Sequence, residues 1–562
     1  MEEKGKQQRF LAGISRITIV IITIVVVVLL NLFLSQKTIT YDLTDNKMYT
    51  LSPASVAAVE SLKEAVEIKA FISPNMPVPL HIVRQNVEDL LSDYVASSNG
   101  KLSYQIISPE GKDEAVEKEA KKYGIEKVAI GQRSENEVSL RAVYKGIAFV
   151  MGDKQEVIGD LRMTGNNAFD NFEYEFTKAL LNLQNENSKK VAFLSGYGGA
   201  VADQNFVPII EPMFKDIYGN LFEVSAIDLS ADDAKLDQEI DALVILNIEK
   251  SVGPKALFLI DQYIQGGGSV AWFQSATIQD NEMAMKIRAQ MGNKGPLPDV
   301  RKKLDTGLND FFAEMGLKLN SDVVLDRERA LATGYIMTDK GPAQVSHPAS
   351  FLLEDLDRTL PFIASIPTLV LPAPSSITIS ERIRKRKGVK ISEIAKSEKS
   401  SIRRSEPPQT LNYQNFLDIG VSEQPGPFVV AAALRGNIPS YYRDNALPEG
   451  VDENKLVKNT KKGRLLIVGS GDFFLANNQV GFDAQLAGVG GQFLFSTIEW
   501  LAQNTALSEI RGKKSPKIIG AVPKEDQRKI QFANIVAVPS LFAFFGVMIM
   551  SFRRRRKEKF EL

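Results

Sequence analysis

Two uncharged apolar runs near the chain ends most constrain what this sequence can fold into. Residues 17–34 and 532–552 contain no Lys, Arg, Asp or Glu. As helices rising 1.5 Å per residue, they come close to or exceed the thickness of a bilayer core of about 30 Å. Basic residues precede the first run and follow the second, so the positive-inside rule places both termini in the cytoplasm. The sequence thus predicts two transmembrane helices with the main domains outside the cytoplasm, and a buried core helix is the alternative for either run.

The composition excludes several classes of function. The chain has 562 residues, no cysteine and two histidines, His81 and His347. Disulfides, thiolate catalysis, iron–sulfur clusters and cysteine zinc sites are therefore excluded, and an imidazole-rich metal site is not expected. Lys plus Arg balance Asp plus Glu at 68 each, so no strongly basic face for nucleic acid is indicated. We expect no cofactor and no metal.

Composition shifts along the chain predict a domain order. Between the two apolar runs, the apolar patterning falls into two folded parts separated by a polar stretch at 185–190. The expected order is a cytoplasmic N-terminus (1–16), a transmembrane helix (17–34), a small α/β domain (38–186), a large α/β domain (189–504), a juxtamembrane linker (505–531), a transmembrane helix (532–552) and a basic cytoplasmic tail (553–562).

The small domain shows strand and helix patterns in a thioredoxin-like order. Ser52 and Pro53 read as the N-cap and first position of a helix. Strand patterns, helix patterns and a hairpin around Gly152 follow, at 66–72, 81–97, 102–107, 113–123 and 144–158. Because no Cys-x-x-Cys pair is present, the domain is not expected to do redox chemistry.

The large domain shows short apolar runs alternating with helix patterns. Strands are expected at 191–194, 224–227, 242–246, 269–273, 428–434 and 465–468, with helices at 207–217, 255–265 and 492–501. This alternation favours a doubly wound parallel sheet covered on both faces. Two stretches interrupt it: 278–305 is polar and suits a loop, and 372–408 contains the basic run ERIRKRKGVK. For that run, a solvated loop and an anion or headgroup contact are the two interpretations.

Two glycine-rich loops follow expected strands and form the candidate ligand cleft. Ligands of doubly wound sheets bind at the carboxyl ends of strands, and each loop follows such an end. The alternative is a turn that only permits close backbone packing. The residues of the candidate cleft are Ser195, Gly196, Tyr197, Gly198, Gly469, Ser470 and Asp472.

Catalytic motifs are missing from the sequence. There is no G-x-x-x-x-G-K-[ST] phosphate-binding loop, and the loop at Ser195 is not G-x-S-x-G. We therefore predict a protein without catalytic residues. The competing hypothesis is an envelope hydrolase or transferase that uses Ser195 or Asp472 in the cleft, with a carboxylate or a lysine as its base.

Several boxes give the chain a resemblance to a known family. They are Y-D-L-T at 41–44, Y-T-L-S at 49–52, Y-K-G at 144–146, F-L-S-G at 193–196, G-G-G at 266–268, K-S-E-K-S at 396–400 and G-S-G-D-F at 469–473. Together with the two apolar runs, they resemble the gliding-motility-associated ABC transporter auxiliary subunits, which are described as substrate-binding-like.

The resemblance implies a fold, a set of partners and a location. The large domain would be similar to a glutamine-amidotransferase-type or intraflagellar-transport-related sheet without a nucleophile. Relatives carry Gly-His-Gly-Glu where this chain has Gly196-Tyr197-Gly198-Gly199. The implied protein is a bacterial inner-membrane subunit whose partners are a polytopic permease, a cytoplasmic ATPase, membrane lipid and an envelope ligand of unknown kind, and whose exported domains bind a ligand or couple motion.

Overall fold

The computed structural model describes residues 50–503, Leu507, Ile510, Ser540 and 543–551 of the chain. Within 50–503 the description leaves out 75, 77–79, 109–113, 134–137, 162–171, 200, 202–205, 232, 291, 293–297, 327, 339–340, 365, 405–408, 411–424, 452–455, 458–461, 472 and 474–483. Met1–Lys514 forms one compact unit and Ser515–Leu562 another. Each unit is described by itself.

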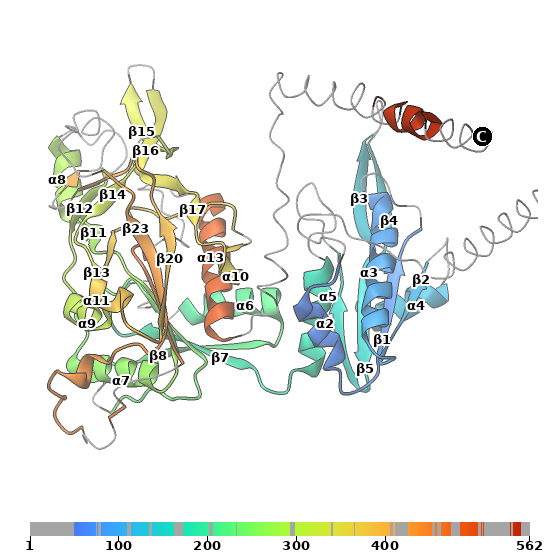
Figure 1. Ribbon diagram of the computed structural model, residues 1–562, viewed down its shortest axis with the longest axis horizontal. Helices are drawn as coiled ribbons and strands as arrows, with labels where there is room; N and C mark the ends of the chain where they lie inside the picture. The colour runs from blue at the N-terminus through green and yellow to red at the C-terminus, as the bar shows by residue number, and fades with distance from the viewer. Residues whose placement is uncertain are drawn as a thin grey trace, which may run out of the picture. The chain divides into compact units, whose positions relative to one another are not determined.

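The first part of the larger unit is a four-stranded mixed sheet with the order β2-β1-β5-β6 (Figure 1). β1 is parallel to β2 and antiparallel to β5, which continues into β6 through a tight hairpin. The elements of this small region are α2 (Pro53–Glu60), β1 (Val66–Ile72), η1 (Leu80–Ile82), α3 (Val83–Ser97), β2 (Leu102–Ile107), α4 (Glu114–Lys122), β3 (Val128–Arg133), β4 (Val138–Val143), β5 (Lys145–Met151), β6 (Lys154–Ile158) and α5 (Phe172–Gln184).

The box Y-T-L-S ends in a residue that fixes the start of α2. Ser52 caps the helix by accepting a hydrogen bond from the Ser55 N–H at 3.0 Å, and Pro53 occupies the first turn. Glu173 of α5 accepts from the Ser52 N–H and from the Ser55 hydroxyl, both at 2.7 Å. The Thr177 hydroxyl extends this buried network: it lies 2.9 Å from the Ser55 hydroxyl and 2.7 Å from the Tyr94 hydroxyl. The Y-T-L-S box, one of the motifs that carry the family resemblance, therefore joins α2 to α5 in the structure.

The second part of the larger unit is built on an eight-stranded sheet with the order β17-β20-β23-β24-β10-β9-β7-β8. Its strands are β7 (Lys189–Ser195), β8 (Phe222–Asp228), β9 (Ala242–Leu246), β10 (Ser269–Phe273), β17 (Asp355–Leu356), β20 (Val389–Lys396), β23 (Val429–Gly436) and β24 (Gly463–Val468). Five neighbours, from β24 to β8, run parallel. β23, β20 and β17 are added antiparallel.

The antiparallel strands correct two sequence-based expectations. The sequence predicts that the run at 428–434 continues a parallel sheet. In the structure this run forms β23, which is antiparallel to β24. The stretch 372–408 is not an interruption, since it supplies β20 to the main sheet. The polar stretch 278–305 carries α8 (Asn281–Gln290) and β12 (Val300–Lys303) instead of being only a loop.

Helices cover both faces of the large sheet, and alternate strand residues point to opposite cores. Phe193, Ala271 and Phe273 lie in one core, whereas Leu194 and Trp272 lie in the other. The helices are α6 (Phe206–Tyr218), α10 (Pro361–Ala364) and α13 (Ala484–Leu501) on the first face, and α7 (Pro254–Gln265), α9 (Leu308–Met315) and α11 (Glu381–Arg384) with their apolar residues in the second core.

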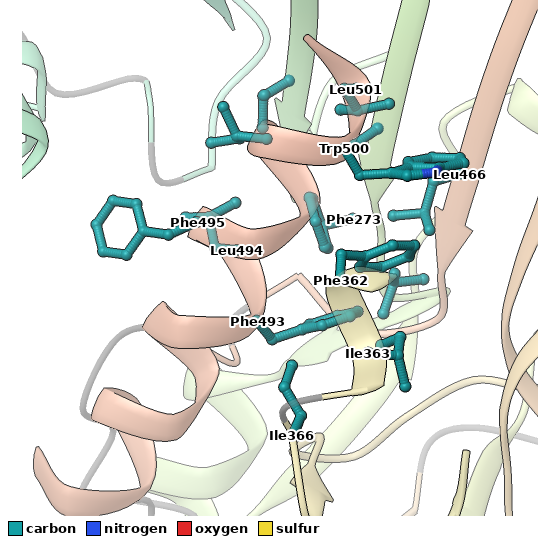
Figure 2. Packing of buried hydrophobic residues seen from close by; sticks show 14 of the residues in the cluster. Phe273, Phe362, Ile363, Ile366, Leu466, Phe493, Leu494, Phe495, Trp500 and Leu501 are labelled. Atoms are coloured by element: carbon teal, nitrogen blue, oxygen red, sulfur yellow. The ribbon is translucent and has the colours of Figure 1, made fainter. Parts of the chain in front are cut away.

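Aromatic packing holds α13 and α10 against the sheet. Figure 2 shows Phe493 and Trp500 of α13 facing Phe362 of α10, with Phe273 of β10 behind them. The Phe362 ring centroid lies 5.0 Å from that of Trp500 and 6.4 Å from that of Phe493. Each large buried ring removes a large apolar area from water, so this cluster contributes strongly to the stability of the region. α13 begins at Ala484, eight positions before the predicted start at Gln492.

Short strands and turns surround this sheet and complete the second part of the larger unit, from β7 to α13, which we call the large region. They form small two- and three-stranded sheets and one long hairpin, β15–β16. These elements are β11 (Thr277–Gln279), β13 (Leu317–Leu319), β14 (Val323–Leu325), β15 (Ala330–Thr338), β16 (Gly341–Leu353), β18 (Leu369–Val370), β19 (Ile377–Ile379), β21 (Ile402–Arg404), β22 (Gln409–Thr410) and η3 (Tyr441–Arg443).

The mixed α/β character is confirmed, but the predicted pair of flanking transmembrane helices is not. Over the described residues, the structure has no helix with the length and apolarity needed to cross a membrane. This finding contradicts the fold class with two membrane spans and the inner-membrane localisation drawn from it. Of the run 532–552, the description covers only Ser540 and residues 543–551. The run 17–34 lies outside the described residues.

Candidate functional site

The parallel strands of the large sheet end along one edge, where the two predicted glycine loops also lie. The loop 196–199 follows β7, and the loop 469–471 follows β24. β10 and β9 lie between these two strands in the sheet. The two predicted loops therefore lie at the same edge of the sheet, and the residues that follow β9 and β10 lie between them.

Asn247, the residue directly after β9, contacts both glycine loops. A Cβ atom on Gly199 would lie 2.0 Å from the Asn247 carbonyl oxygen, and a Cβ atom on Gly471 would lie 2.2 Å from the Asn247 Cβ. Gly199 also has a φ of 74°, a conformation that L side chains rarely adopt. Both positions therefore need glycine so that the loops can close on Asn247.

Amide and hydroxyl side chains link the strand ends to one another. Gln274 follows β10; its Nε2 donates to the Ile248 carbonyl at 3.0 Å, and its Oε1 accepts from the Ile248 N–H at 3.1 Å. Asn247 Oδ1 accepts from the Ser275 N–H at 3.2 Å, and Ser275 Oγ accepts from the Gly471 N–H at 3.1 Å. Asn247, Gln274 and Ser275 are buried, so this network stabilises the carboxyl edge in one arrangement.

The candidate residues after β24 are covered by the segment 372–375. The Gly469 carbonyl accepts from the Ser375 N–H at 2.7 Å. Ser470 is fully buried, and its hydroxyl donates to the Pro372 carbonyl at 2.9 Å. Asp472, the carboxylate candidate of the same loop, lies outside the described residues.

The loop after β7 holds its backbone against the loop after β9. The Tyr197 carbonyl accepts from the N–H groups of Glu249 and Lys250, each at 2.9 Å. The Tyr197 side chain is buried, and burial raises the pKa of its phenol. Ser195 is half-buried, and none of the hydrogen bonds among the described residues joins its hydroxyl to a histidine or a carboxylate. Without such a base, a serine hydroxyl is a poor nucleophile.

A cavity of about 280 Å³ opens beside the end of β10. Gln274 and Ser275 form one wall, and the start of α9 with the loop before it forms the other. Its polar lining includes Lys303, Asp305, Thr306, Asn309, Asp310 and Ser321. The cavity could not be predicted from the sequence, because its walls come from segments that are distant in the chain, at 274–276, 303–312 and 319–321. A polar residue placed directly after a buried parallel strand, as at Asn247 and Gln274, marks the edge but does not show whether the side chain binds a ligand or a neighbouring loop.

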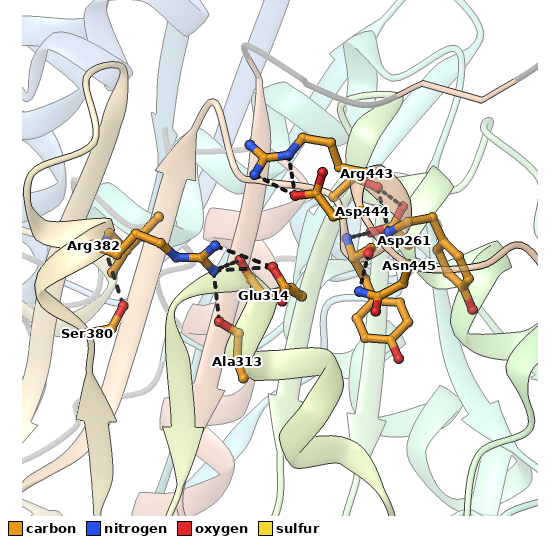
Figure 3. A network of polar contacts seen from close by, with 12 residues as sticks. Asp261, Ala313, Glu314, Ser380, Arg382, Arg443, Asp444 and Asn445 are labelled. Atoms are coloured by element: carbon orange, nitrogen blue, oxygen red, sulfur yellow. Dashed lines mark hydrogen bonds and ion pairs between the residues drawn. The ribbon is translucent and has the colours of Figure 1, made fainter.

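The basic run at 382–390 is largely occupied by contacts within the chain. Figure 3 shows Arg382 at the end of α9, where its guanidinium donates to the Ala313 and Glu314 carbonyls at 3.0 and 2.6 Å. Arg384 pairs with Glu393 at 2.5 Å. Arg386 donates to the Asn437 carbonyl at 3.2 Å. These three arginines, expected either in a solvated loop or edge or at an anion or headgroup, bind groups of the chain itself.

The two histidines differ in environment. His81 is exposed in η1, whereas His347 is buried with its Nε2 3.8 Å from Asp299 Oδ2. Burial lowers the pKa of His347. Asp299 is held by Arg301 at 2.8 Å. Throughout the described part of the chain, no three acidic or histidine side chains come together in a way that could hold a metal ion.

Two protein families match parts of the larger unit. Residues 188–495 match the family described as "ABC-type uncharacterized transport system". Residues 45–150 match a domain of unknown function, DUF7088. The first match covers more than half of the chain and contains the whole parallel sheet. It does not identify gliding motility as the process served.

The chain is also similar to one protein in sequence and to two solved structures in fold alignment. An uncharacterized protein of Borreliella burgdorferi is 23% identical over 538 residues, which are 92% of this chain and 93% of that protein. Among solved structures, the N-terminal domain of mmIFT52 aligns with a TM-score of 0.29 at 10% identity, over 55% of this chain and 97% of that one. A putative ThuA-like protein of Bacteroides uniformis aligns with a TM-score of 0.26 at 12% identity, over 56% and 93%.

Proposed function

The chain belongs to the family described as an ABC-type uncharacterized transport system, and on that premise we propose that it is a non-catalytic accessory subunit of an ABC transport complex. Its α/β regions act as a binding or coupling module. The partners are a permease and an ATPase, because the chain has no phosphate-binding loop of its own. Gliding motility, as the process served, is proposed from the resemblance alone.

The observation that carries the proposal is the family match across the complete parallel sheet. The carboxyl edge of that sheet is where an enzyme of this architecture would place its catalytic groups. In this chain, Asn247, Gln274 and Ser275 bond to neighbouring loops at that edge. Such an edge is suited to holding the loops in position, and a ligand would occupy it through displacement of these bonds or through the adjoining cavity.

Contacts between α5 and the α6–β8 turn support a coupling role. Asn182 of α5 is buried; its Nδ2 donates to the Tyr218 carbonyl at 3.1 Å, and its Oδ1 accepts from the Asn220 N–H at 2.8 Å. The Asn220 carbonyl accepts from Asn185 and Ser188. Because Glu173 of the same helix binds the start of α2, α5 connects the beginning of the small region with the large sheet.

Purification of the full chain with an affinity tag in a mild detergent tests the proposal. A multi-span permease and an ATPase with a phosphate-binding loop should be recovered, and the complex should hydrolyse ATP while the isolated chain does not. Recovery of the chain as a monomer without either subunit would contradict the proposed role.

A second measurement separates coupling from binding. Asn182→Ala should lower the ATP hydrolysis rate of the assembled complex without reducing the recovery of its subunits, since the hydrogen bonds that Asn182 makes lie within this chain. Asn281→Ala, at an exposed position on α8, serves as the control. If the ATP hydrolysis rate is unchanged in Asn182→Ala, coupling through α5 is contradicted and a binding role stands.

A further inference from the structure

The large sheet ends at β8, and among the described residues no strand pairs with its outer side. We propose that the outer edge of β8, with the exposed stripe of α6 beside it, docks an extended apolar and basic segment of a partner subunit by strand addition. This inference rests on the proposed accessory role and specifies the surface that performs it.

Backbone direction follows from the pairing of β8 with β7. The Leu221 carbonyl, directly before β8, accepts from the Lys189 N–H at 2.8 Å and thus points towards β7. Backbone groups alternate in direction along a strand, so those of Val224 and Ala226 point outwards. The centre of β8, from Val224 to Ile227, has no charged side chain. An added strand would therefore find unpaired donors and acceptors without a charged obstacle.

An apolar stripe on α6 lies next to this edge. Ile209 and Met213, one turn apart, are 65% and 48% exposed. The neighbouring side of the helix, with Phe206, Ile210 and Phe214, packs into the core over β8. Pro212 has no N–H, so the carbonyl of Pro208 one turn earlier loses its helical donor. Exposed apolar residues beside an open strand edge can pack against the side chains of an added segment.

Charge selects the partner. The charged side chains of α6 and β8 are exposed, and they comprise four acids and one base: Glu211, Lys215, Asp216, Glu223 and Asp228. Two copies of this surface would bring acidic side chains together, which disfavours self-pairing. A segment that carries Lys or Arg between apolar residues complements the surface, and we therefore infer a partner subunit as the occupant.

Two substitutions test the surface without disturbing the β7 ladder. Ala226→Pro removes an N–H that points outwards, which an edge strand tolerates. Ile209→Glu places a charge in the stripe. Met285→Glu is the matched control, because Met285 is 63% exposed on another helix, α8. The tagged full chain and its variants are purified from cells that contain the permease and the ATPase, and recovery of both subunits is quantified by mass spectrometry.

The outcomes separate this inference from the proposed function. With both test variants, the amounts of permease and ATPase recovered should fall about tenfold or more, while the amounts recovered with Met285→Glu stay near those of wild type. Unchanged tryptophan fluorescence should show that the variants keep the fold. If wild type recovers both subunits and the two variants do so equally, the docking surface is refuted and the accessory role stands. If wild type recovers neither, the accessory role itself fails. A wild-type dimer in light scattering that Ala226→Pro dissociates would overturn the inference in favour of self-pairing.

Discussion

Asp261 gives the large region a pH dependence opposite to that of an ordinary carboxylate. It is fully buried on α7, where Oδ1 accepts from the Tyr441 N–H and Oδ2 from the Ser440 hydroxyl, both at 2.8 Å (Figure 3). Burial raises its pKa from 3.8 to about 6, and the hydrogen bonds from Ser440, Tyr441 and Gln262 only partly offset this rise. Ionisation is therefore less favourable in the folded than in the unfolded chain.

The magnitude follows from the linkage between pKa and stability. The folded chain binds the proton more tightly, so the stability that protonated Asp261 contributes is present below pH 4 and is lost as the pH rises through about 6. A difference of about two pKa units corresponds to roughly 3 kcal/mol. Between pH 7.5 and 4.5, about 2 kcal/mol of this is recovered, because at pH 4.5 the unfolded carboxyl is still mostly ionised.

Tryptophan fluorescence isolates this effect. Trp272 and Trp500, the two tryptophans of the chain, both lie in the cores of the large region, so urea unfolding monitored by their emission reports that region. Asp261→Asn keeps an acceptor for the Tyr441 N–H and removes the titration. The free energy of unfolding of wild type, relative to Asp261→Asn, should rise by about 2 kcal/mol between pH 7.5 and 4.5.

Subtraction of the variant cancels the titration of all other groups. Asp444→Asn is the control, since Asp444 lies in the same turn with a side chain that is 62% exposed. Its difference from wild type should lack the change of about 2 kcal/mol, because Asp444→Asn removes no buried carboxyl. A wild-type minus Asp261→Asn difference that stays constant to within about 0.5 kcal/mol over this range would refute the argument that burial governs this carboxyl.

Three further predictions concern the strand ends and the cores. Gly199→Ala should destabilise the large region by about 2 kcal/mol or more in urea unfolding, because its Cβ would overlap the Asn247 carbonyl. Gly488→Ala is the control: the position lies in α13 with open space around it, so this variant should not be destabilised. Phe493→Ala should cost about 3–5 kcal/mol in the same assay, and a value under about 1 kcal/mol would contradict the packing in Figure 2. Ser195 should not react with a fluorophosphonate probe for activated serines, and labelling of Ser195 detected by peptide mass spectrometry would revive the hydrolase hypothesis.

The bounds of β9 and β10 could be predicted to the residue, whereas α8 could not be predicted at all. β9 and β10 are buried at every position and begin and end where their apolar runs do. α8 buries only Ala284, so its sequence shows no apolar stripe and reads as loop. The antiparallel pairing of β20 with β23 depends on contacts between distant parts of the chain, which local patterns do not report.

The candidate site shows the same division. The position of the Ser195 and Gly469 loops followed from the rule that parallel strands end at one edge. The roles of Asn247 and Gln274 did not, because an amide after a strand has the same local pattern whether it binds a ligand or a neighbouring loop. The basic run at 382–390 was ambiguous for a related reason: Glu314 and Asn437, which bind Arg382 and Arg386, lie more than 50 positions away in the sequence.

Hydrogen-bond accounting distinguishes the two edges of the large sheet as places for a partner. At the carboxyl edge, the polar groups of Asn247, Gln274 and Ser275 already bond to each other's loops. A ligand that displaced them would have to replace each buried bond, and a buried group left without a partner costs about 1–3 kcal/mol. Along β8 the outward backbone groups of Val224 and Ala226 have no strand beside them among the described residues, so an added strand replaces water at these groups and breaks no buried hydrogen bond. For an accessory subunit, whose work is to hold other subunits, the open edge of β8 is therefore the more favourable place to bind.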